Sequence, residues 1–253
     1  MLMSAKVRLD KLLVERGLAA SRERAHALVL AGKVLVDEQK VEKAGATVDP
    51  AADVRILGED LKYVSRGGVK LERALKHWHI EVYGRVCMDV GTSTGGFTDC
   101  LLQHGAARVI AIDTGYGQIA HRLRQDPRVR LLERTNARYL KPEDVGEPVD
   151  FVAVDVSFIS VTLVLPAVLR AARGEAHRQL ELVVLVKPQF EAGREAVGKG
   201  GIVRDAQAQS RAVEKVRAAV LELGATWADS TDSPILGAEG NREFLLHAVF
   251  ENL

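Results

Sequence analysis

A glycine-rich segment that follows an apolar run limits most strongly what this chain can fold into. The segment Asp89-Val-Gly-Thr-Ser-Thr-Gly-Gly-Phe-Thr-Asp99 comes after Val86-Cys87-Met88, which predicts the end of a buried strand. It comes before Cys100-Leu-Leu-Gln-His104, which predicts the start of a helix. Such a turn lets backbone N–H groups approach a ligand closely at a helix N-terminus. The pattern is typical of two chemistries, dinucleotide binding and S-adenosylmethionine (SAM) binding.

Strand and helix patterns alternate along the chain from Val86 onward. This alternation predicts a mostly parallel sheet with helices on both faces. The predicted fold class is therefore α/β, with a Rossmann-like sheet. Strands are expected at 86–90, 108–113, 129–132, 151–155, 182–187, 225–229 and 243–250.

Composition and charge limit the partners of the chain. The formal net charge is +1 over 253 residues, so any nucleic-acid footprint must be local. Cys87 and Cys100 are too far apart for a metal or redox motif and are typical of a reducing compartment. Early charges and the lack of a long apolar run predict neither a signal peptide nor a membrane helix. We expect a cytoplasmic monomer with no membrane partner, no DNA partner and no metal.

Residues 8–57 have the pattern of a separate small unit. Apolar residues recur at helical spacing from Arg8 to Arg16, and Gly17 ends this helix. Ser21 is placed to cap a second helix from Arg22 to Ala31. Short strands are expected at 34–36, near 41 and at 54–57.

Charge is unevenly distributed within this unit. Residues 1–35 hold seven Lys or Arg residues against three acids, whereas residues 36–60 hold three against seven. A basic helical face therefore remains although the net charge cancels. Charge alone does not decide whether this face is a solvated surface or an RNA-binding surface.

Three short motifs of this unit resemble the S4-type RNA-binding domain. They are Arg8-Leu-Asp-Lys-Leu-Leu, Ser21-Arg22-x-x-Ala25 and Leu30-Ala-Gly-Lys-Val-Leu-Val36, in the order and spacing of that family. The resemblance implies that the two helices and the Gly-Lys-Val turn face structured RNA. Basic side chains there would contact phosphates, which position a protein on RNA without reading its sequence. Arg66 is added from the basic segment that follows this unit. The RNA-binding candidates are then Arg8, Lys11, Arg22, Arg24, Lys33 and Arg66.

Two further strand ends carry polar residues that bear on the choice of cofactor. The glycines at 91, 95 and 96 fit the G-x-G-x-x-G dinucleotide pattern poorly, and Asp113 would suit a ribose diol in either chemistry. Asp155 and Lys187 each follow an apolar strand, which puts an acid and an amine at the ligand-binding edge of the sheet. Taken singly, Asp155 could be a helix cap and Lys187 a solvated strand end.

Seven ordered motifs make the chain similar to the TlyA (haemolysin A) family, which joins an S4-type domain to an FtsJ/RrmJ-like ribose methyltransferase domain. The resemblance implies SAM-dependent 2′-O-methylation of ribosomal RNA, with 23S rRNA expected and 16S rRNA as a second candidate. It implies an S4-type domain at 6–59, a linker at 60–66 and a methyltransferase domain at 67–253. The motifs begin at residues 63, 89, 113, 133, 155, 187 and 198.

The chain departs from the usual family pattern at two places. Gly91-Thr-Ser93 stands where the family usually has Gly-Ala-Ser, and Gly237-Ala-Glu-Gly-Asn241 lacks the common Gly-Pro. The first change is small. The second lies beside a candidate catalytic residue and leaves the geometry of that loop open.

The resemblance also implies a Lys-Asp-Lys-Glu catalytic set, at Lys70, Asp155, Lys187 and Glu243. A ribose hydroxyl is a very weak acid, so its attack on a methyl group needs proton removal or stabilisation of the developing charge. Lys187 is the candidate base or hydroxyl-steering group, which Asp155 would orient. Glu243 could instead be a surface residue, and Lys70 could instead hold an RNA phosphate.

The SAM-binding candidates are carried over from the same resemblance. They comprise the acid that opens the turn, the turn itself, an acid for the ribose diol and an amide near the adenine. They are Asp89, Gly91, Ser93, Thr94, Gly95, Gly96, Phe97, Asp113 and Asn136. The alternative function is a haemolysin-like or RNA-binding protein with an inactive methyltransferase domain.

Overall fold

The computed structural model describes residues 6–19, 21–57, 62–173, 179–237 and 239–251. Its internal contacts divide the chain into two units, Met1–Leu61 and Lys62–Leu253. The segment 62–66, expected to belong to the linker, thus groups with the second unit. Tyr63 shows why, because its side chain is 1% exposed and packs in the core of that unit.

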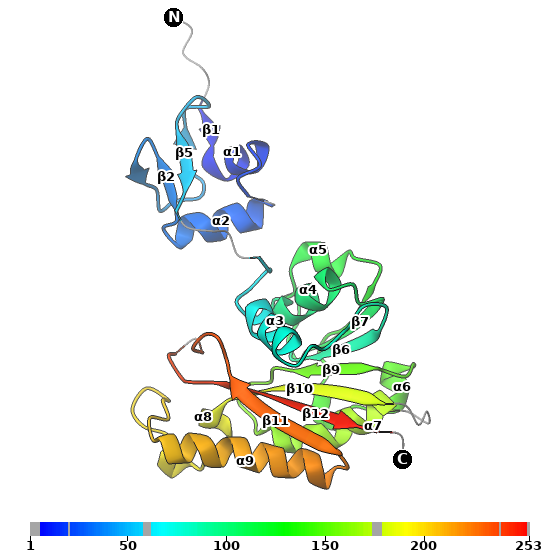
Figure 1. The fold of residues 1–253 in the computed structure, drawn as a ribbon. Helices are drawn as coiled ribbons and strands as arrows, with labels where there is room; N and C mark the ends of the chain where they lie inside the picture. Colours follow the sequence, from blue (N-terminus) through cyan, green and yellow to red (C-terminus); the bar gives the residue numbers. More distant parts are fainter. Residues whose placement is uncertain (1–5, 20, 58–61, 174–178, 238, 252–253) are drawn as a thin grey trace, which may run out of the picture. The chain divides into compact units, whose positions relative to one another are not determined.

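The first unit packs two helices against short strands around a small apolar core (Figure 1). Its helices are α1 (Leu9–Glu15) and α2 (Arg22–Leu30). Its strands are β1 (Val7–Arg8), β2 (Val34–Val36), β3 (Gln39–Lys40), β4 (Thr47–Val48) and β5 (Val54–Ile56). Strands β3, β2 and β5 form one sheet, and β1 pairs with β4 in another.

Local sequence explains where the helices of this unit begin and end. Ser21 has extended backbone, and its hydroxyl accepts a hydrogen bond from the backbone N–H of Arg24 at 3.1 Å, which caps α2. Gly17 and Gly32 have positive φ angles just after the two helices, a conformation that glycine adopts without strain. The predicted helix boundaries therefore follow from these three residues.

The second unit is built on a seven-stranded sheet in the order β11-β12-β10-β9-β6-β7-β8. Strand β12 runs antiparallel to both of its neighbours, and the pairs formed by β10, β9, β6, β7 and β8 are parallel. The predicted mostly parallel α/β sheet is confirmed. The strands are β6 (Val86–Val90), β7 (Arg108–Ile112), β8 (Val129–Leu132), β9 (Phe151–Val154), β10 (Leu180–Val186), β11 (Trp227–Asp232) and β12 (Phe244–Phe250).

Helices cover both faces of this sheet, and each face has its own apolar core (Figure 1). Helices α3 (Gly67–His77), α4 (Gly96–Gln103) and α5 (His121–Arg124) lie on one face. Helices α6 (Pro142–Val145), α7 (Leu165–Arg173) and α9 (Ala206–Glu222) lie on the other. Successive strand residues point to opposite faces, so β9 is apolar throughout and β10 is apolar except for Glu181 near its start.

Short helical segments complete the loops of the second unit. They are η1 (Ala137–Tyr139), η2 (Val161–Leu163), α8 (Pro188–Glu191) and η3 (Arg194–Ala196). Helix α8 begins at the proline that follows Lys187, whose backbone is extended. Lys187 is therefore the last residue before the chain turns away from β10.

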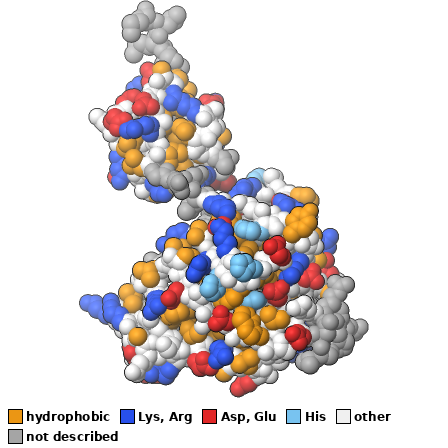
Figure 2. Space-filling model, in the orientation of Figure 1, with side chains coloured by type: hydrophobic (Ala, Val, Ile, Leu, Met, Phe, Trp, Pro, Cys, Tyr) orange, Lys and Arg blue, Asp and Glu red, His pale blue; other side chains and the backbone are white. Residues whose placement is uncertain are grey.

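The surface carries both signs of charge. Figure 2 shows Lys and Arg side chains intermingled with Asp and Glu side chains on the visible face of both units. This mixture fits the formal net charge of +1. No helix within the described ranges is long and apolar enough to cross a membrane.

The cap of α2 gives a first testable prediction. We expect Ser21→Ala to destabilise α2 by about 1 kcal/mol, because the N–H of Arg24 loses its acceptor. Hydrogen exchange of the α2 amides should then accelerate roughly fivefold, whereas the amides of the second unit should be unchanged. Ser21→Asp is the matched control, since aspartate caps helices about as well as serine. Equal exchange in all three proteins would contradict this role.

Candidate active site

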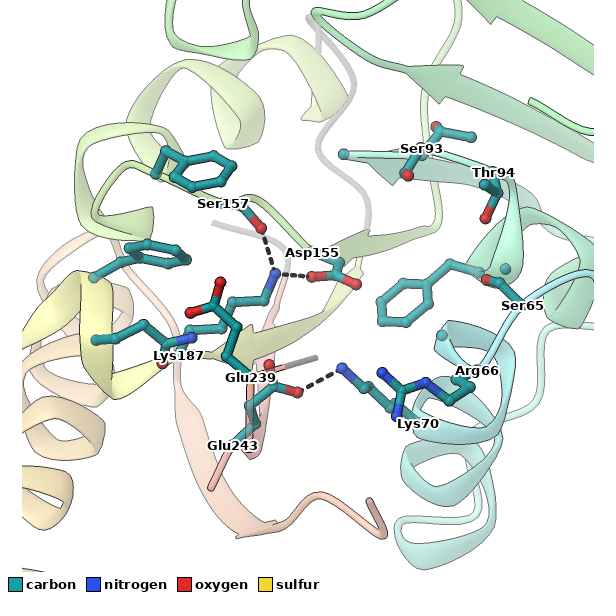
Figure 3. Close-up of a pocket in the computed structure, with 18 of the residues that line it drawn as sticks. Ser65, Arg66, Lys70, Ser93, Thr94, Asp155, Ser157, Lys187, Glu239 and Glu243 are labelled. Carbon is teal, nitrogen blue, oxygen red and sulfur yellow. Dashed lines mark hydrogen bonds and ion pairs between the residues drawn. The ribbon is translucent and has the colours of Figure 1, made fainter. Parts of the chain in front are cut away.

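Two adjoining cavities open where β6, β9 and β10 end. The first has a volume of about 580 Å³ and the second about 400 Å³. The first lies between the start of α3, the glycine turn and the segments that follow β9 and β10 (Figure 3). Residues that line both cavities are Gly91, Ser93, Asp155, Ser157 and Phe158. This shared wall follows β6 and β9, the two central strands.

Lys187 and Asp155 meet as an ion pair in the first cavity (Figure 3). Lys187 Nζ lies 2.5 Å from Asp155 Oδ1 and donates a hydrogen bond to Ser157 Oγ at 2.8 Å. The Lys187 side chain is 10% exposed, so the ammonium is held in one place. Apart from this contact with Lys187, Asp155 Oδ1 accepts no hydrogen bond from a described residue, and Asp155 lines both cavities.

A second buried pair joins Lys70 of α3 to Glu243, which directly precedes β12. Lys70 Nζ donates to Glu243 Oε2 at 2.5 Å, and the two side chains are 11% and 4% exposed. Breaking such a pair is costly because it leaves a buried charge without a partner. The expectation that Glu243 could be a surface residue is therefore wrong, because Glu243 is buried.

Asp89 is the most buried acid of the site. Its side chain is fully buried, and Oδ2 accepts hydrogen bonds from the Thr98 backbone N–H at 2.9 Å and from the Thr98 hydroxyl at 2.6 Å. Burial raises the pKa of Asp89 to about 7, and the nearby Asp155 and Asp113 act in the same direction. Asp89 lines neither cavity, so it anchors the start of α4 beneath the glycine turn.

Asp113 lines the second cavity and holds the glycine turn in place. Its Oδ2 accepts a hydrogen bond from the Ser93 N–H at 2.7 Å, and Oδ1 accepts one from the Gly115 N–H at 2.6 Å. Each oxygen keeps a further lone pair for a ligand hydroxyl. Asn136 lines the same cavity, and its side chain accepts a hydrogen bond from the Arg138 N–H at 3.0 Å.

The glycine turn makes close contacts that only glycine permits. Gly91 has a φ of +89°, and a Cβ there would lie 2.3 Å from the backbone carbonyl oxygen of Asp155. A Cβ on Gly96 would lie 2.3 Å from Ser65 Oγ and 2.9 Å from Gly68 N. The turn is therefore packed tightly between the β9 segment on one side and the start of α3 on the other.

The structure sorts the predicted cofactor residues into four groups. Gly91 and Ser93 line both cavities, and Asp113 and Asn136 line only the second. The residues that line only the first cavity are Thr94, Gly96 and Phe97. Asp89 and Gly95 line neither cavity and support the turn from behind.

The predicted RNA-binding residues of the first unit lie mostly on its surface. Arg8 and Arg22 both pair with the buried Asp10, at 2.9 and 3.0 Å, while their side chains stay 54% and 62% exposed. The hydrogen bond from Arg8 holds the pKa of Asp10 well below its usual range, and Arg22 contributes. Lys11 pairs with Glu15 at 3.4 Å, so each of these three cations has an acidic neighbour.

The other three predicted RNA-binding residues have different surroundings. Arg24 lies on α2, and Lys33 is half-buried in the turn that follows α2. Arg66 is exposed and lines the first cavity of the second unit.

Among the residues of the first cavity that had no predicted role, three have side chains suited to ligand contact. Phe158 and Phe190 line it with ring centroids 5.5 Å apart, and Glu239 adds a carboxylate. Phe158 is 92% exposed and has a φ of +65°, an unusual conformation for an aromatic residue. Phe158 follows Asp155 by three positions, and Phe190 follows Lys187 by three. This shared spacing is the sequence feature that could have placed both rings near the site. No described group of three His, Cys, Asp or Glu residues is arranged to hold a metal.

The order of the strands in the sheet, the glycine turn and the two buried ion pairs together define a Rossmann-like methyltransferase domain. The FtsJ-like methyltransferase family matches residues 63–250, and the S4 domain family matches residues 7–54. The chain belongs to the FtsJ-like methyltransferase family and carries an S4 domain before its methyltransferase domain.

Similar proteins confirm the resemblance to the TlyA (haemolysin A) family. The 16S/23S rRNA (cytidine-2'-O)-methyltransferase TlyA of Mycobacterium tuberculosis is 48% identical, over 96% of this chain and 90% of that protein. Hemolysin A of Brachyspira hyodysenteriae is 39% identical, over 96% of this chain and 100% of that protein. A solved structure of a candidate hemolysin from Streptococcus thermophilus matches with a TM-score of 0.73 at 42% identity, covering 99% of this chain and 90% of that one.

The raised pKa of Asp89 predicts a pH-dependent stability. The folded pKa of about 7 exceeds the ordinary carboxyl value near 4, so the folded state holds a proton that the unfolded chain releases between these values. The stability that this proton provides is full below pH 4 and is lost as the pH rises through 7. Asp89→Asn removes this dependence because an amide does not titrate.

We expect the unfolding free energy of Asp89→Asn, relative to the unaltered protein, to increase by about 2–3 kcal/mol between pH 5 and pH 8. Urea unfolding followed by tryptophan fluorescence measures this in the second unit, because Trp78 and Trp227 both lie there. A difference that is the same at both pH values would show that Asp89 titrates alike in the folded and unfolded states.

Proposed function

We propose that this protein is a SAM-dependent methyltransferase that transfers a methyl group to the ribose 2′-hydroxyl of a cytidine in ribosomal RNA. The observation that carries the proposal is the Lys187–Asp155 pair on the wall shared by two cavities. The family match supports methyl transfer, and the TlyA relative is named for rRNA and for cytidine. Large-subunit 23S rRNA is the expected substrate, with 16S rRNA as the second.

The second cavity fits the cofactor. Asp113 offers carboxylate oxygens for a ribose diol, Asn136 lies beside it, and the tight turn at Gly91 lets backbone groups approach a ligand. When bound, SAM supplies a methyl group on a positively charged sulfur. Asp155 lies on the wall shared by both cavities, so its carboxylate would face that positive charge.

The first cavity holds the groups that act on the ribose. Lys187 donates a hydrogen bond to the 2′-oxygen, which orients a lone pair of that oxygen toward the methyl carbon. Transfer of the methyl group to this oxygen would leave the electron pair of the broken carbon–sulfur bond with the sulfur of the donor. The hydroxyl proton would pass to the Asp155 carboxylate, which lines the same cavity, and from there to water. Lys70 and Glu243 form a neutral pair beside this centre.

The first unit is proposed to dock the RNA. Arg8 and Arg22 are held in place by Asp10 but keep more than half of their side-chain surface exposed. Ordered guanidinium groups contact phosphates with a smaller loss of entropy than free ones. We further propose that the protein works as a monomer in the cytoplasm and that neither DNA nor a membrane is a partner.

The alternative of an inactive methyltransferase domain lacks a structural cause. All four predicted catalytic side chains are present in the first cavity, and they form two ion pairs. The name haemolysin belongs to some of the relatives and is no evidence against methyl transfer in this cavity.

Replacement of Lys187 tests the proposed function. Wild-type protein should transfer label from tritiated SAM to 23S rRNA or to large ribosomal subunits, and nuclease digestion should release 2′-O-methylcytidine. We expect Lys187→Ala to lower kcat at least 100-fold, because the 2′-oxygen loses its hydrogen-bond donor. Lys187→Met, which keeps most of the side-chain volume, should behave the same way and should bind SAM as tightly as wild type.

Two outcomes would overturn the proposal. If wild-type protein labels neither 23S nor 16S rRNA, free or in subunits, ribosomal RNA is not the substrate. If both Lys187 variants label RNA as well as wild type does, Lys187 does not have the role proposed for it.

Lys33 tests the RNA-docking role of the first unit. We expect Lys33→Gln to raise KM for RNA severalfold and to leave kcat unchanged. The slope of log affinity against log salt concentration should become shallower by about one, the amount that one lost phosphate contact gives. Lys43→Gln, a change at an exposed residue in the acidic half of the unit, is the matched control. An identical salt dependence for both variants would show that Lys33 does not contact the RNA backbone.

A further inference from the structure

Only some of the charged side chains that line the first cavity form ion pairs with one another. Its three cations and three carboxylates form two ion pairs, Lys70 with Glu243 and Lys187 with Asp155. Among the described residues, the remaining two charges, Arg66 and Glu239, have no ion-pair partner. These two side chains are therefore free to contact a ligand.

Glu239 is an unexpected residue in a cavity that binds RNA. Its carboxylate points into the cavity on the side of Lys187 (Figure 3). Gly201 leaves room for it, since a Cβ on Gly201 would lie 3.3 Å from Glu239 Oε2. A carboxylate repels phosphates, so this position is suited to a base and unsuited to the RNA backbone.

The same cavity offers a surface on which a base can stack. Phe158 is 92% exposed and lines the cavity beside Phe190. Aromatic side chains bind unstacked RNA bases, and the edge of such a base is then read by hydrogen bonds. Carboxylates accept hydrogen bonds from the N4 amino group of cytosine, whereas uracil carries a carbonyl oxygen at that position.

We propose that Glu239 is a specificity-determining residue that accepts a hydrogen bond from the exocyclic amino group of the target cytosine. The base lies on the side of the cavity formed by Phe158 and Glu239. Arg66, on the opposite wall, takes the adjacent phosphate, so the ribose lies between them at Lys187. This inference rests on the proposed function, because it assigns the reader of the base that the methyltransferase modifies.

The test compares methylation of RNA that has a cytidine at the target position with methylation of RNA that has a uridine there. The methylated nucleotide is first mapped in 23S rRNA by mass spectrometry of nuclease digests. Large subunits are then prepared with either cytidine or uridine at that position. The ratio of kcat/KM for cytidine over uridine is measured for wild type, Glu239→Gln and Glu239→Ala.

We expect wild type to favour cytidine by about 10- to 100-fold, the range of one hydrogen bond to a charged group. Glu239→Gln should reduce this ratio to about threefold or less, because the amide can also donate to the uracil carbonyl. Glu239→Ala should lower the rate on cytidine and leave the rate on uridine nearly unchanged. The Kd for SAM should stay at its wild-type value in both variants.

Glu195→Gln is the matched control, because Glu195 is an exposed acid on η3 that does not line the first cavity. A ratio that Glu239→Gln leaves at its wild-type value would overturn the inference. So would an equal loss of both rates, which would indicate that Glu239 acts only on the charge of Lys187. A wild-type protein that labels no RNA would instead overturn the proposed function itself, so the two failures are distinguishable.

Discussion

The close approach of Gly91 to the backbone of Asp155 is the contact on which the rest of the site depends. No side chain fits between them, since a Cβ on Gly91 would lie 2.3 Å from the Asp155 carbonyl oxygen. This contact joins the turn after β6 to the segment after β9, and the shared wall of the two cavities begins there. Asp89 supports it from below through Thr98, so one buried carboxyl, one glycine and one carbonyl set the distance between donor and acceptor sites.

Two buried ion pairs next to a cavity are an expensive arrangement. Desolvation of the four groups offsets much of their attraction, so the pairs contribute little to stability. Their value is geometric, because a paired Lys187 and a paired Lys70 cannot sample other rotamers freely. The electrostatic environment is therefore in place before any ligand enters, which is how such sites lower a barrier without reorganising.

Features encoded within a few residues could be predicted from the sequence, and features that depend on distant partners could not. The cap at Ser21, the strands of the seven-stranded sheet and the turn glycines are local, and the structure has them close to where they were expected, whereas β1 and β4 of the first unit were not predicted. The pairing of Arg22 with Asp10 depends on the packing of α1 against α2. The positive φ of Phe158 depends on the loop after β9, and the full burial of Asp89 depends on the place of β6 between β9 and β7, so neither follows from a local sequence pattern.

The antiparallel direction of β12 in the seven-stranded sheet has a consequence for how the site is assembled. Because β12 runs against its neighbours, its first residues lie at the edge where the parallel strands end, and Glu243 reaches Lys70 there. The two partners are 173 positions apart in the chain, and β12 must insert between β10 and β11 before they can meet. Such long-range contacts form late in folding, after their loop-closure cost has been met. A partly folded chain would therefore lack the pairing of Lys70 with Glu243, and the charge set of the first cavity would be incomplete.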